Sequence, residues 1–447
     1  MKRVIVTGGA GFVGSHVVDA LLRQGCTVMS YDCLLPQVHP ASPEWPAYQP
    51  VQEGLSLHFG DVRDPRAMAF ALADFRPDTV IHLAAHVGVG QSQHEVARYT
   101  SGNVTGTANL LQCVLEYNLG VRERAARVAE VEAKQATPEP GQTQEEAQAL
   151  YLQRIAPMLE DLRAQPSAPI GQVLVAGSMS SYGEGAYRLL DAGLAEREGS
   201  LPADWRNGDE EVVRPTAGPW GPCPGHWDAP GMEPMATPEW WPLEPESVYA
   251  WTKAQQEALA LLVWDTRGRA EGLAIKVARF FNAYGPRQAL TNPYTGVGAI
   301  FSARVKAGLA PVVFEDGGQL RDFTHVTDVA SAVLAILDHG TAGCTYNVGT
   351  GIPTSILQVA RAICAGEVDD DGKPIEPRVV QVARVGDIRH CYGNVNQLWA
   401  LGWEPKVQLE DGLVELRQWV HDQPVDLTTD LLERANADLE RYGLVRQ

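Results

Sequence analysis

A tyrosine and a lysine in the middle of the chain have the types and the spacing that proton transfer needs. Tyr249 and Lys253 stand four residues apart, so they share one face if residues 249–263 form the helix that their pattern predicts. A free phenol, with a pKa of about 10, is a poor base at neutral pH. A neighbouring ammonium would stabilise the phenolate and lower that pKa. Because such pairs also arise by chance in helices, the meaning of this one depends on the elements around it.

A serine is predicted to meet the same reacting group. The apolar run at 172–176 is typical of a buried strand, and Ser178 follows it two residues later. Ligands bind at the carboxyl ends of strands in an open parallel sheet. We therefore expect the Ser178 hydroxyl to hydrogen-bond and orient the same substrate oxygen as Tyr249. Ser180 and Ser181 also fit the simpler role of turn formers.

A glycine-rich turn near the start of the chain is spaced for a dinucleotide. An apolar run at 4–6 predicts a buried strand, and helical periodicity follows the turn. Gly8 permits the tight turn, Gly11 lets the backbone approach a phosphate, and Gly14 lets the helix pack closely on the strand. The helix N-terminus offers unpaired N–H groups to the phosphates. Strand, turn and helix together predict a dinucleotide site rather than a purely structural turn.

An acidic residue at the end of the next strand selects the dinucleotide. Residues 27–31 predict the second strand, and Asp32 ends it close to the interval at which a carboxylate meets the adenosine ribose 2′-hydroxyl. A carboxylate there would repel a 2′-phosphate, and no arginine follows it immediately. The sequence therefore favours NAD over NADP. With NAD bound, Tyr249 could take a hydroxyl proton while hydride leaves the same carbon.

Alternating strands and helices predict the fold class. Further strand patterns lie at 55–59, 79–83, 172–176, 273–279 and 345–348, with helical patterns between them. Strands separated by helices imply right-handed βαβ units. We predict an α/β fold: a Rossmann-type, doubly wound parallel sheet of about seven strands with helices on both faces. A smaller mixed α/β C-terminal substrate domain and two insertions complete it.

The predicted domains follow from where the alternation breaks and resumes. They are an NAD-binding Rossmann domain at 1–183 with a helical-hairpin insertion at 121–168, a long irregular insertion or lid at 184–245, a Rossmann continuation at 246–282 that carries the Tyr/Lys helix, and a mainly substrate-binding part at 283–447, of which 322–348 returns to the Rossmann domain.

The two insertions allow different interpretations. Residues 121–168 are rich in Ala, Glu, Gln and Arg, and predict two helices around a turn. A solvated hairpin is favoured over a contact surface, because charge-rich helices are usually solvated. Residues 184–245 are crowded with Pro, Gly and Trp, which is typical of a lid or binding loop. Cys223 and His226 lie three apart there, but they do not make a four-ligand site, so no metal is predicted.

Composition excludes several classes of function. A formal net charge of -19 over 447 residues argues against a nucleic-acid-binding surface. No run of apolar residues is long enough to span a membrane. The first strand begins at residue 3, which leaves no room for a signal peptide. Seven scattered cysteines fit reduced thiols. The sequence predicts a cytoplasmic enzyme.

Taken together, the motifs resemble the extended short-chain dehydrogenase/reductase family, in its branch of NAD-dependent nucleotide-sugar epimerases and dehydratases. The resemblance covers most of residues 1–118 and 170–440. The matching segments are 8–14, 61–62, 82–85, 103–109, 178–183, 249–253, 279–286 and 321–323.

The resemblance implies a role for each of several side chains. The catalytic residues would be Ser178, Tyr249 and Lys253. NAD would be bound by Gly8, Gly11, Phe12, Val13, Gly14, Asp32, Asp61, Val62, Leu83, Ala84, Ala85, Asn103, Tyr249 and Lys253, with Asp61 and Val62 at the adenine and Ala84 along the nicotinamide side. The substrate would be bound by Ser180, Asn282, Arg287, Arg321 and Asp387, the arginines meeting its pyrophosphate or nucleoside. A homodimer that acts on a dTDP- or UDP-hexose is the expected assembly.

One departure from the family pattern decides the expected reaction. Dehydratases of this branch carry Asp-Glu directly after the catalytic Ser/Thr, where this chain has Met179 and Ser180. Without that acid, what remains is oxidation and re-reduction at one carbon, as in an NAD-dependent nucleotide-sugar 4-epimerase. Residues 182–187, 287–296 and 386–390 also look most like the epimerases. One alternative is a deoxysugar 4-ketoreductase or dehydrogenase with exchangeable cofactor. The other is a non-catalytic NAD-binding sensor. The intact Ser178, Tyr249 and Lys253 argue against the sensor, because a protein that only binds NAD does not need all three.

Overall fold

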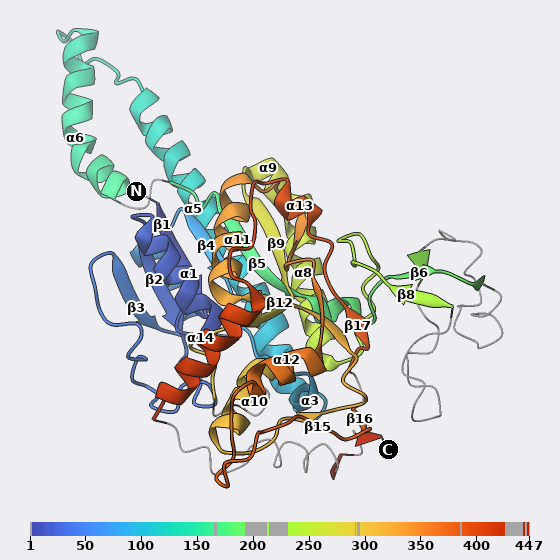
Figure 1. Cartoon of the computed structure of the whole chain (residues 1–447). Coiled ribbons are helices and arrows are strands. Elements are labelled where there is room, and N and C mark those ends of the chain that lie inside the picture. The colour runs from blue at the N-terminus through green and yellow to red at the C-terminus, as the bar shows by residue number, and fades with distance from the viewer. Residues whose placement is uncertain are drawn as a thin grey trace.

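The apolar strand patterns of the sequence form one parallel sheet. This computed structural model describes residues 2–164, 168–192, 212–213, 231–290, 292, 296–384, 387–424, 441–442 and 445–446. Among them, seven strands lie in the order β13-β9-β5-β4-β1-β2-β3, and every neighbouring pair is parallel (Figure 1). Their bounds are β1 (Arg3–Thr7), β2 (Thr27–Asp32), β3 (Leu55–Phe59), β4 (Thr79–His82), β5 (Gln172–Ser178), β9 (Ala274–Phe280) and β13 (Thr345–Val348). The predicted doubly wound sheet is confirmed.

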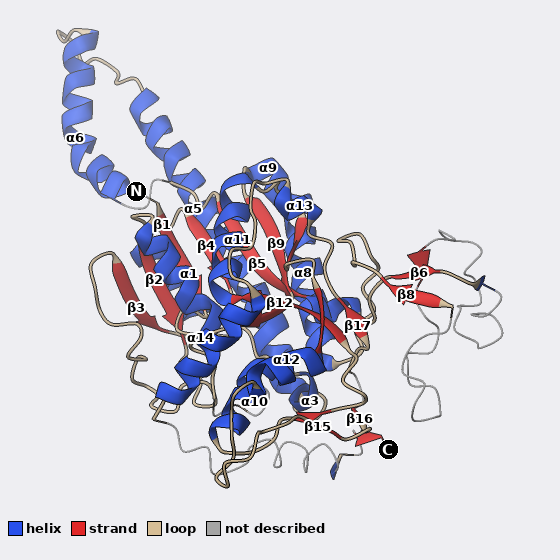
Figure 2. Cartoon of the chain, viewed as in Figure 1, coloured by secondary structure: helices blue, strands red, loops and turns tan. Residues whose placement is uncertain are grey.

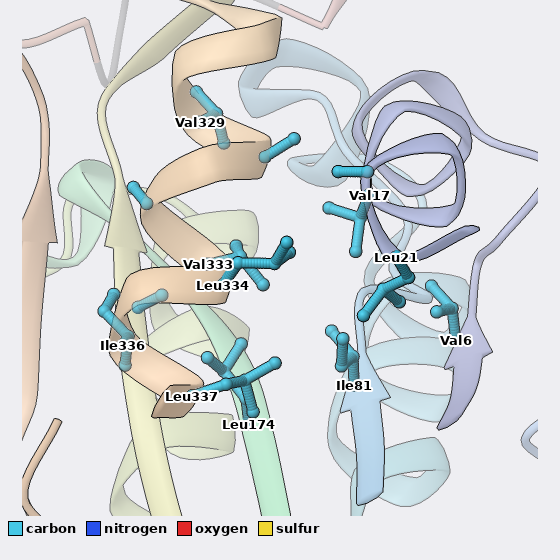
Figure 3. Close-up of a cluster of buried hydrophobic side chains, with 14 of the residues drawn as sticks. Val6, Val17, Leu21, Ile81, Leu174, Val329, Val333, Leu334, Ile336 and Leu337 are labelled. Atoms are coloured by element: carbon cyan, nitrogen blue, oxygen red, sulfur yellow. The ribbon is translucent and has the colours of Figure 1, made fainter. Parts of the chain in front are cut away.

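Helices cover both faces of this sheet because its strands are apolar on both sides. On one face α1 (Phe12–Arg23) and α11 (Val326–His339) pack on side chains such as Val6, Ile81 and Leu174 (Figure 3). On the other face α2 (Pro65–Phe75), α5 (Gly106–Ala133) and α8 (Val248–Val263) pack on Ile5 and its neighbours. Each such side chain contributes roughly 1.5–3 kcal/mol when fully buried. The strand ends that carry the candidate site are therefore held by two separate cores.

A smaller part with its own core lies beside the sheet (Figure 2). Its strands β10 (Asn282–Tyr284), β12 (Leu320–His325), β14 (Pro353–Ser355) and β17 (His390–Cys391) form a mixed sheet, in which β12 pairs parallel with β10 and β17 and antiparallel with β14. Its helices are α10 (Val297–Lys306), α12 (Ile356–Cys364) and α14 (Leu409–Asp422). Phe301, Ile363 and Leu416, one from each helix, are buried together. The chain returns from this part to the main sheet through α11 and β13.

Short elements complete the described chain. They are α3 (Val89–Ser92), α4 (Val96–Tyr99), a π-helix η1 (Thr100–Thr105), a 3-10 helix η2 (Met179–Tyr182), a π-helix η4 (Trp264–Gly268), α9 (Arg269–Glu271), α13 (Asn396–Trp399), and the strands β11 (Val312–Val313), β15 (Arg378–Val379), β16 (Ala383–Arg384) and β18 (Val445–Arg446). No helix of the described residues combines the length and the apolar character that crossing a membrane requires.

The first insertion is a long helical hairpin. The helix predicted near 103–116 continues without a break as α5 to Ala133, and α6 (Gln144–Ala164) packs back against it. Burial along α5 stops at Val121. The base of the hairpin is fixed by Asn118, which donates to the Ile170 carbonyl at 2.9 Å and accepts from the Ile170 N–H at 2.7 Å. The hairpin leaves the body at the sheet edge where the strands begin (Figure 1).

Removal of the hairpin should therefore leave the chemistry intact. Ligands bind at the opposite, carboxyl edge of the sheet. We expect a variant in which a short Gly/Ser linker replaces residues 124–166, and which keeps Asn118 and Ile170, to retain NAD and turnover while losing solubility or assembly. Turnover by NMR and NAD content by chromatography check this. A folded, NAD-loaded variant without turnover would show that the hairpin belongs to the active site.

The second insertion is only partly described. Strands β6 (Tyr187–Leu189), β7 (Val212–Val213) and β8 (Met232–Pro234) form a small antiparallel sheet, with β6 in the middle. Trp241 is buried in a cluster with Met179 and Phe281, whereas Trp240 is exposed. The remaining tryptophans of this insertion, with Cys223 and His226, lie outside the described residues. In the part of the chain that the structure describes, no three His, Cys, Asp or Glu side chains gather as metal ligands would.

Candidate active site

The three predicted catalytic side chains come together at the carboxyl edge of the sheet. Ser178 ends β5, and Tyr249 and Lys253 lie in the first two turns of α8. The Ser247 hydroxyl caps this helix by accepting from the Ala250 N–H at 3.1 Å. The Tyr249 side chain hydrogen-bonds with Ser178, and its backbone N–H donates to the Ser92 hydroxyl at 2.9 Å. The tyrosine is thus fixed from both α3 and β5.

Burial controls the charge of both ionisable groups. It raises the pKa of Tyr249, and the hydrogen bond with Ser178 opposes this only in part. It lowers the pKa of Lys253 to about 7, and the nearby Glu257 carboxylate opposes that. In the protein alone the phenol is therefore a weaker acid than free tyrosine, whereas the sequence predicted a stronger one. Desolvation is the largest influence on the pKa of Tyr249, and the amino-acid sequence does not report how deeply the phenol is buried.

A buried histidine lies beneath Lys253. The His82 ring nitrogens lie 2.7 Å from the Thr7 hydroxyl and 2.9 Å from the Thr107 hydroxyl. Burial and the Lys253 charge lower the pKa of His82 to about 3, so the ring is neutral. Because Thr107 donates its only hydroxyl proton to the Asn103 carbonyl at 2.7 Å, His82 must donate through Nε2. Its Nδ1 then accepts from Thr7, which joins the start of the glycine turn to the helices behind the site.

Asn103 ties the loop after β4 to the catalytic helix. It lies in the π-helix η1, a form that is frequent at functional sites. Its Oδ1 accepts from the His86 N–H at 2.7 Å, and its Nδ2 donates to the His86 carbonyl at 3.1 Å and to the Thr252 hydroxyl at 2.9 Å. Asn103 was predicted among the NAD-binding residues, and in this structure its side chain positions the loop that carries Leu83, Ala84 and Ala85.

The glycine turn forms the cradle that a dinucleotide requires. A Cβ on Gly8 would lie 2.7 Å from the Ala84 nitrogen, and a Cβ on Gly14 would lie 2.0 Å from the Gly8 carbonyl oxygen. A Cβ on Gly11 would approach only that oxygen, at 3.2 Å, so this glycine faces open space. Phe12 and Val13 begin α1 directly after it. The turn therefore fits NAD, and Gly8 lies against Ala84, another residue that is predicted to bind it.

The acidic residues expected at the adenosine lie at the end of β2 and just after β3. Asp32 is buried and accepts from the N–H groups of Ala10, at 3.1 Å, and Leu34, at 2.8 Å. Burial raises the pKa of Asp32, and these N–H groups oppose the rise. Asp61 instead pairs with Arg63, with its Oδ2 2.6 Å from the guanidinium, and the pKa of Asp61 is lowered. Asp32 thus contacts the glycine turn directly, whereas Asp61 follows the neighbouring strand β3, and the roles of both at the adenosine stay predictions.

Adding one methyl group to the turn should remove the cofactor. In Gly14→Ala the new Cβ would meet the Gly8 carbonyl, so the turn must shift and lose alignment of its N–H groups. We expect the NAD content of the purified protein to fall by roughly tenfold or more, which corresponds to a loss of about 1.4 kcal/mol. Gly171→Ala is the matched control, because its Cβ meets its nearest neighbour at 3.9 Å. Equal NAD content in both variants would place the dinucleotide elsewhere.

The predicted substrate residues have different surroundings. Asn282 lies in β10, and its buried Oδ1 has no hydrogen-bond partner among the described residues. The hydroxyls of Ser180 and Ser178 lie 2.8 Å apart. Arg321 donates to the carbonyls of Leu320, at 2.8 Å, and Arg389, at 2.9 Å. Asn282 thus has a buried oxygen without a partner among the described residues, whereas the Ser180 hydroxyl contacts Ser178 and much of the Arg321 guanidinium is engaged by backbone.

Arg287 and Asp387 are both engaged by other residues of the protein. An Arg287 guanidinium nitrogen lies 2.8 Å from the Asp19 carboxylate on α1. Asp387 lies near Glu315, whose pKa is raised first by burial, with Asp387 adding to the rise. Neither contact excludes the predicted roles, which remain predictions. The contact to α1 places Arg287 beside the helix that follows the glycine turn.

Known proteins resemble the chain over nearly its whole length. A family model described as GDP-mannose 4,6 dehydratase matches residues 5–131, and one described as the NAD dependent epimerase/dehydratase family matches residues 227–349. A dTDP-L-rhamnose 4-epimerase of Burkholderia thailandensis is 31% identical over 425 residues, which is 94% of this chain and 95% of that protein. The chain belongs to the NAD dependent epimerase/dehydratase family.

Other members support the same fold. A UDP-glucose 4-epimerase of Mycolicibacterium smegmatis is 26% identical over 92% of this chain and 96% of its own length. The crystal structure of a Thermus thermophilus UDP-glucose 4-epimerase in complex with NAD superposes with a TM-score of 0.60 at 24% identity, and covers 94% of this chain and 99% of that one. The predicted family and Rossmann-type fold are confirmed.

Sequence reasoning missed the side chains that fix the site from behind. Glu257 lies four residues after Lys253 on the same helix, and it opposes the loss of charge on that lysine. Its guanidinium partner is Arg279 on β9, with both side chains nearly fully buried. Two signals were available: the helical spacing from Lys253 to Glu257, and a charged residue inside the apolar strand 274–280, where burial demands a partner.

Proposed function

We propose that this chain is an NAD-dependent nucleotide-sugar 4-epimerase. The observation that carries the proposal is that Ser178 at the end of β5 lies together with Tyr249 and Lys253 at the start of α8, with Met179 and Ser180 where a dehydratase of this family needs its acids. The rhamnose-nucleotide and glucose-nucleotide 4-epimerases named above support it.

The chain's own residues would handle the proton and the orientation of the sugar. NAD supplies the hydride acceptor and donor for the C4 carbon when it is bound. Tyr249 would take the C4 hydroxyl proton as the carbon is oxidised and return it when the carbon is reduced on the opposite face. Ser178 would hold the same oxygen through its hydroxyl. Lys253 would supply positive charge beside the phenol, and Glu257 helps to keep that charge.

Two features favour epimerisation over dehydration. Met179 is buried among apolar side chains in the short helix that follows β5, and it cannot move a proton. Ser180, which has no group that titrates near neutral pH, contacts Ser178 instead. Loss of water across two sugar carbons needs an acid and a base of its own, beside Tyr249. A single proton-transfer group suffices for oxidation and reduction at one carbon.

The substrate-binding part is proposed to lie in residues 283–447 outside the returning 322–348, with residues 184–245 as a lid. The division of 1–183 and 246–282 as the NAD-binding part belongs to the same proposal. A dTDP- or UDP-hexose is the proposed substrate. Asn282, with its unpaired buried oxygen, and Ser180 support a sugar between the two parts.

We further propose a homodimer in the cytoplasm. Trp251 is 45% exposed and Leu262 is 59% exposed on α8, eleven residues and thus three turns apart on one face. A two-fold axis would bury the same apolar face of both copies. The six cysteines of the described residues are free thiols, which supports a reducing compartment. Sedimentation as a monomer at micromolar concentration would contradict the dimer.

The decisive test is C4 inversion without added cofactor. Purified protein is incubated with a panel of dTDP- and UDP-hexoses, and the sugar configuration is followed by NMR. We expect inversion at C4 for one of them, with NAD present in the purified protein. Turnover that consumes added reduced cofactor in equal amount would instead identify a 4-ketoreductase, and NAD binding without turnover on any sugar would identify a sensor.

A further inference from the structure

The carbonyl side of the glycine turn is held by a long loop. The loop 33–54 leaves β2 after Asp32 and crosses the turn before β3. From it, Gln49 donates to the Gly9 carbonyl at 2.9 Å, and the Tyr48 hydroxyl donates to the Ala10 carbonyl at 2.7 Å. With these carbonyls fixed, the N–H groups of the turn keep their direction. The loop therefore controls both the turn and the surroundings of Asp32.

Arg287, from the part of the chain proposed to bind the substrate, contacts this loop. The Arg287 guanidinium lies over the Tyr48 ring, 5.1 Å from its centroid, and it pairs with Asp19 on α1 at 2.8 Å. Arg287 has a φ of 72°, a backbone conformation that is uncommon for a residue with a side chain, so its position is imposed by the surrounding contacts. The glycine turn contacts the loop, the loop contacts Arg287, and Arg287 contacts α1, which directly follows the turn.

Two further contacts join the same segments. The His16 Nε2 on α1 lies 3.1 Å from the Pro286 carbonyl, and Gln37 in the loop donates to the Asn292 side chain at 2.9 Å. Burial, and next the Arg287 charge, lower the pKa of His16 to about 4, so this ring is neutral at physiological pH. It therefore adds no repulsion to the neighbouring guanidinium. Pro286 consequently contacts the helix after the turn, and Asn292 contacts the loop after Asp32.

We propose that Tyr48, Arg287 and Asp19 form a clasp that retains bound NAD. The clasp rests on the proposed function, because an epimerase must keep its cofactor between the two hydride transfers. The loop 33–54 begins at the residue expected on the adenosine ribose, so the loop must move for that end of the dinucleotide to leave. Because the Asp19 carboxylate holds Arg287 over the Tyr48 ring, this movement must break the cation–π contact of Tyr48 as well as its hydrogen bond to the Ala10 carbonyl.

The test is the exchange of bound NAD. Purified holoprotein is mixed with excess isotope-labelled NAD, and the bound fraction is followed by mass spectrometry. We expect exchange about tenfold faster in Arg287→Met, which corresponds to about 1.4 kcal/mol. Tyr48→Phe, which keeps the ring and loses the hydroxyl that donates to Ala10, should exchange a few-fold faster. The control is Arg267→Met, which removes an arginine that pairs with Glu271 at 2.9 Å, at the opposite edge of the sheet.

The outcomes separate the clasp from the proposed function. Fast exchange in Arg287→Met and Tyr48→Phe, with slow exchange in wild type and control, supports the clasp whether or not C4 inversion is found. Exchange at the wild-type rate in both variants overturns it, and so does fast exchange in a wild-type protein that inverts C4. Because Tyr48→Phe preserves the packing, a poorly folded Arg287→Met does not leave the proposal untested.

Discussion

Replacing Tyr249 with phenylalanine should lower kcat by about 10²–10⁴-fold, the usual contribution of a positioned acid–base group. The change deletes only the hydroxyl, which hydrogen-bonds with Ser178. The ring keeps its edge-on contact with Tyr99, 6.4 Å between centroids, so the packing of the site should persist. NAD content should remain near that of wild type, because the cofactor is expected on the glycine turn.

A tyrosine outside the site provides the matched control. Tyr151 lies on the helical hairpin, where its hydroxyl donates to the Val131 carbonyl at 3.2 Å. Tyr151→Phe should leave kcat unchanged. Single-turnover measurements with the preferred hexose would separate loss of chemistry from loss of substrate binding. If Tyr249→Phe turned over at a near-normal rate, another group would have to be the base, and the assignment of Ser178 would fall with it.

The main sheet was predictable because its signals are local. Each strand is a short apolar run, each is followed by a helical pattern, and the alternation allows few topologies other than parallel crossovers. The glycine turn, Asp32 and Ser178 lie at ends of such strands, so their positions followed from the fold. Helix ends were less predictable: α5 continues to Ala133 because residues 117–133 contain no proline, and Gly120 alone does not end the helix.

Contacts between distant segments were not predictable in the same way. The family resemblance placed Arg287 at the pyrophosphate or nucleoside of the substrate, but its partners Tyr48 and Asp19 lie more than two hundred residues away in sequence. The hydrophobic periodicity of a sequence does not show which distant side chains will pair. The same is true of His82, which the sequence places inside the predicted strand 79–83 and which lies in a hydrogen-bonded network near Lys253.

Neutralising one member of the buried pair behind the site should cost more stability than any surface change. Arg279 donates through Nε to Glu257 at 2.8 Å and through Nη2 to the same carboxylate. Its Nη1 donates to the Tyr182 hydroxyl at 2.6 Å and to the Glu239 carbonyl at 2.8 Å. Glu257 also accepts from the Thr345 hydroxyl at 3.0 Å. Arg279→Met would leave the carboxylate buried without its counter-charge. We expect a loss of about 3–5 kcal/mol in the free energy of unfolding.

Urea denaturation measures this loss, and an exposed pair provides the comparison. Arg269 and Asp265 lie 3.2 Å apart with side chains 63% and 64% exposed. Arg269→Met should change stability by less than about 1 kcal/mol. If Arg279→Met also lost less than about 1 kcal/mol in the free energy of unfolding, the buried pair would not be held as the structure shows it.

The double variant Glu257→Leu with Arg279→Met separates stability from chemistry. The double variant has no buried carboxylate left without a partner, so much of the stability lost in Arg279→Met should return. Turnover should not return with it. Glu257 is the carboxylate that opposes the loss of charge on Lys253, and without it burial acts on the lysine unopposed. The pH profile of kcat should then lose activity at a lower pH than in wild type, because the pKa of Lys253 falls further. Recovery of both stability and an unchanged pH profile would show that the pair serves the fold alone.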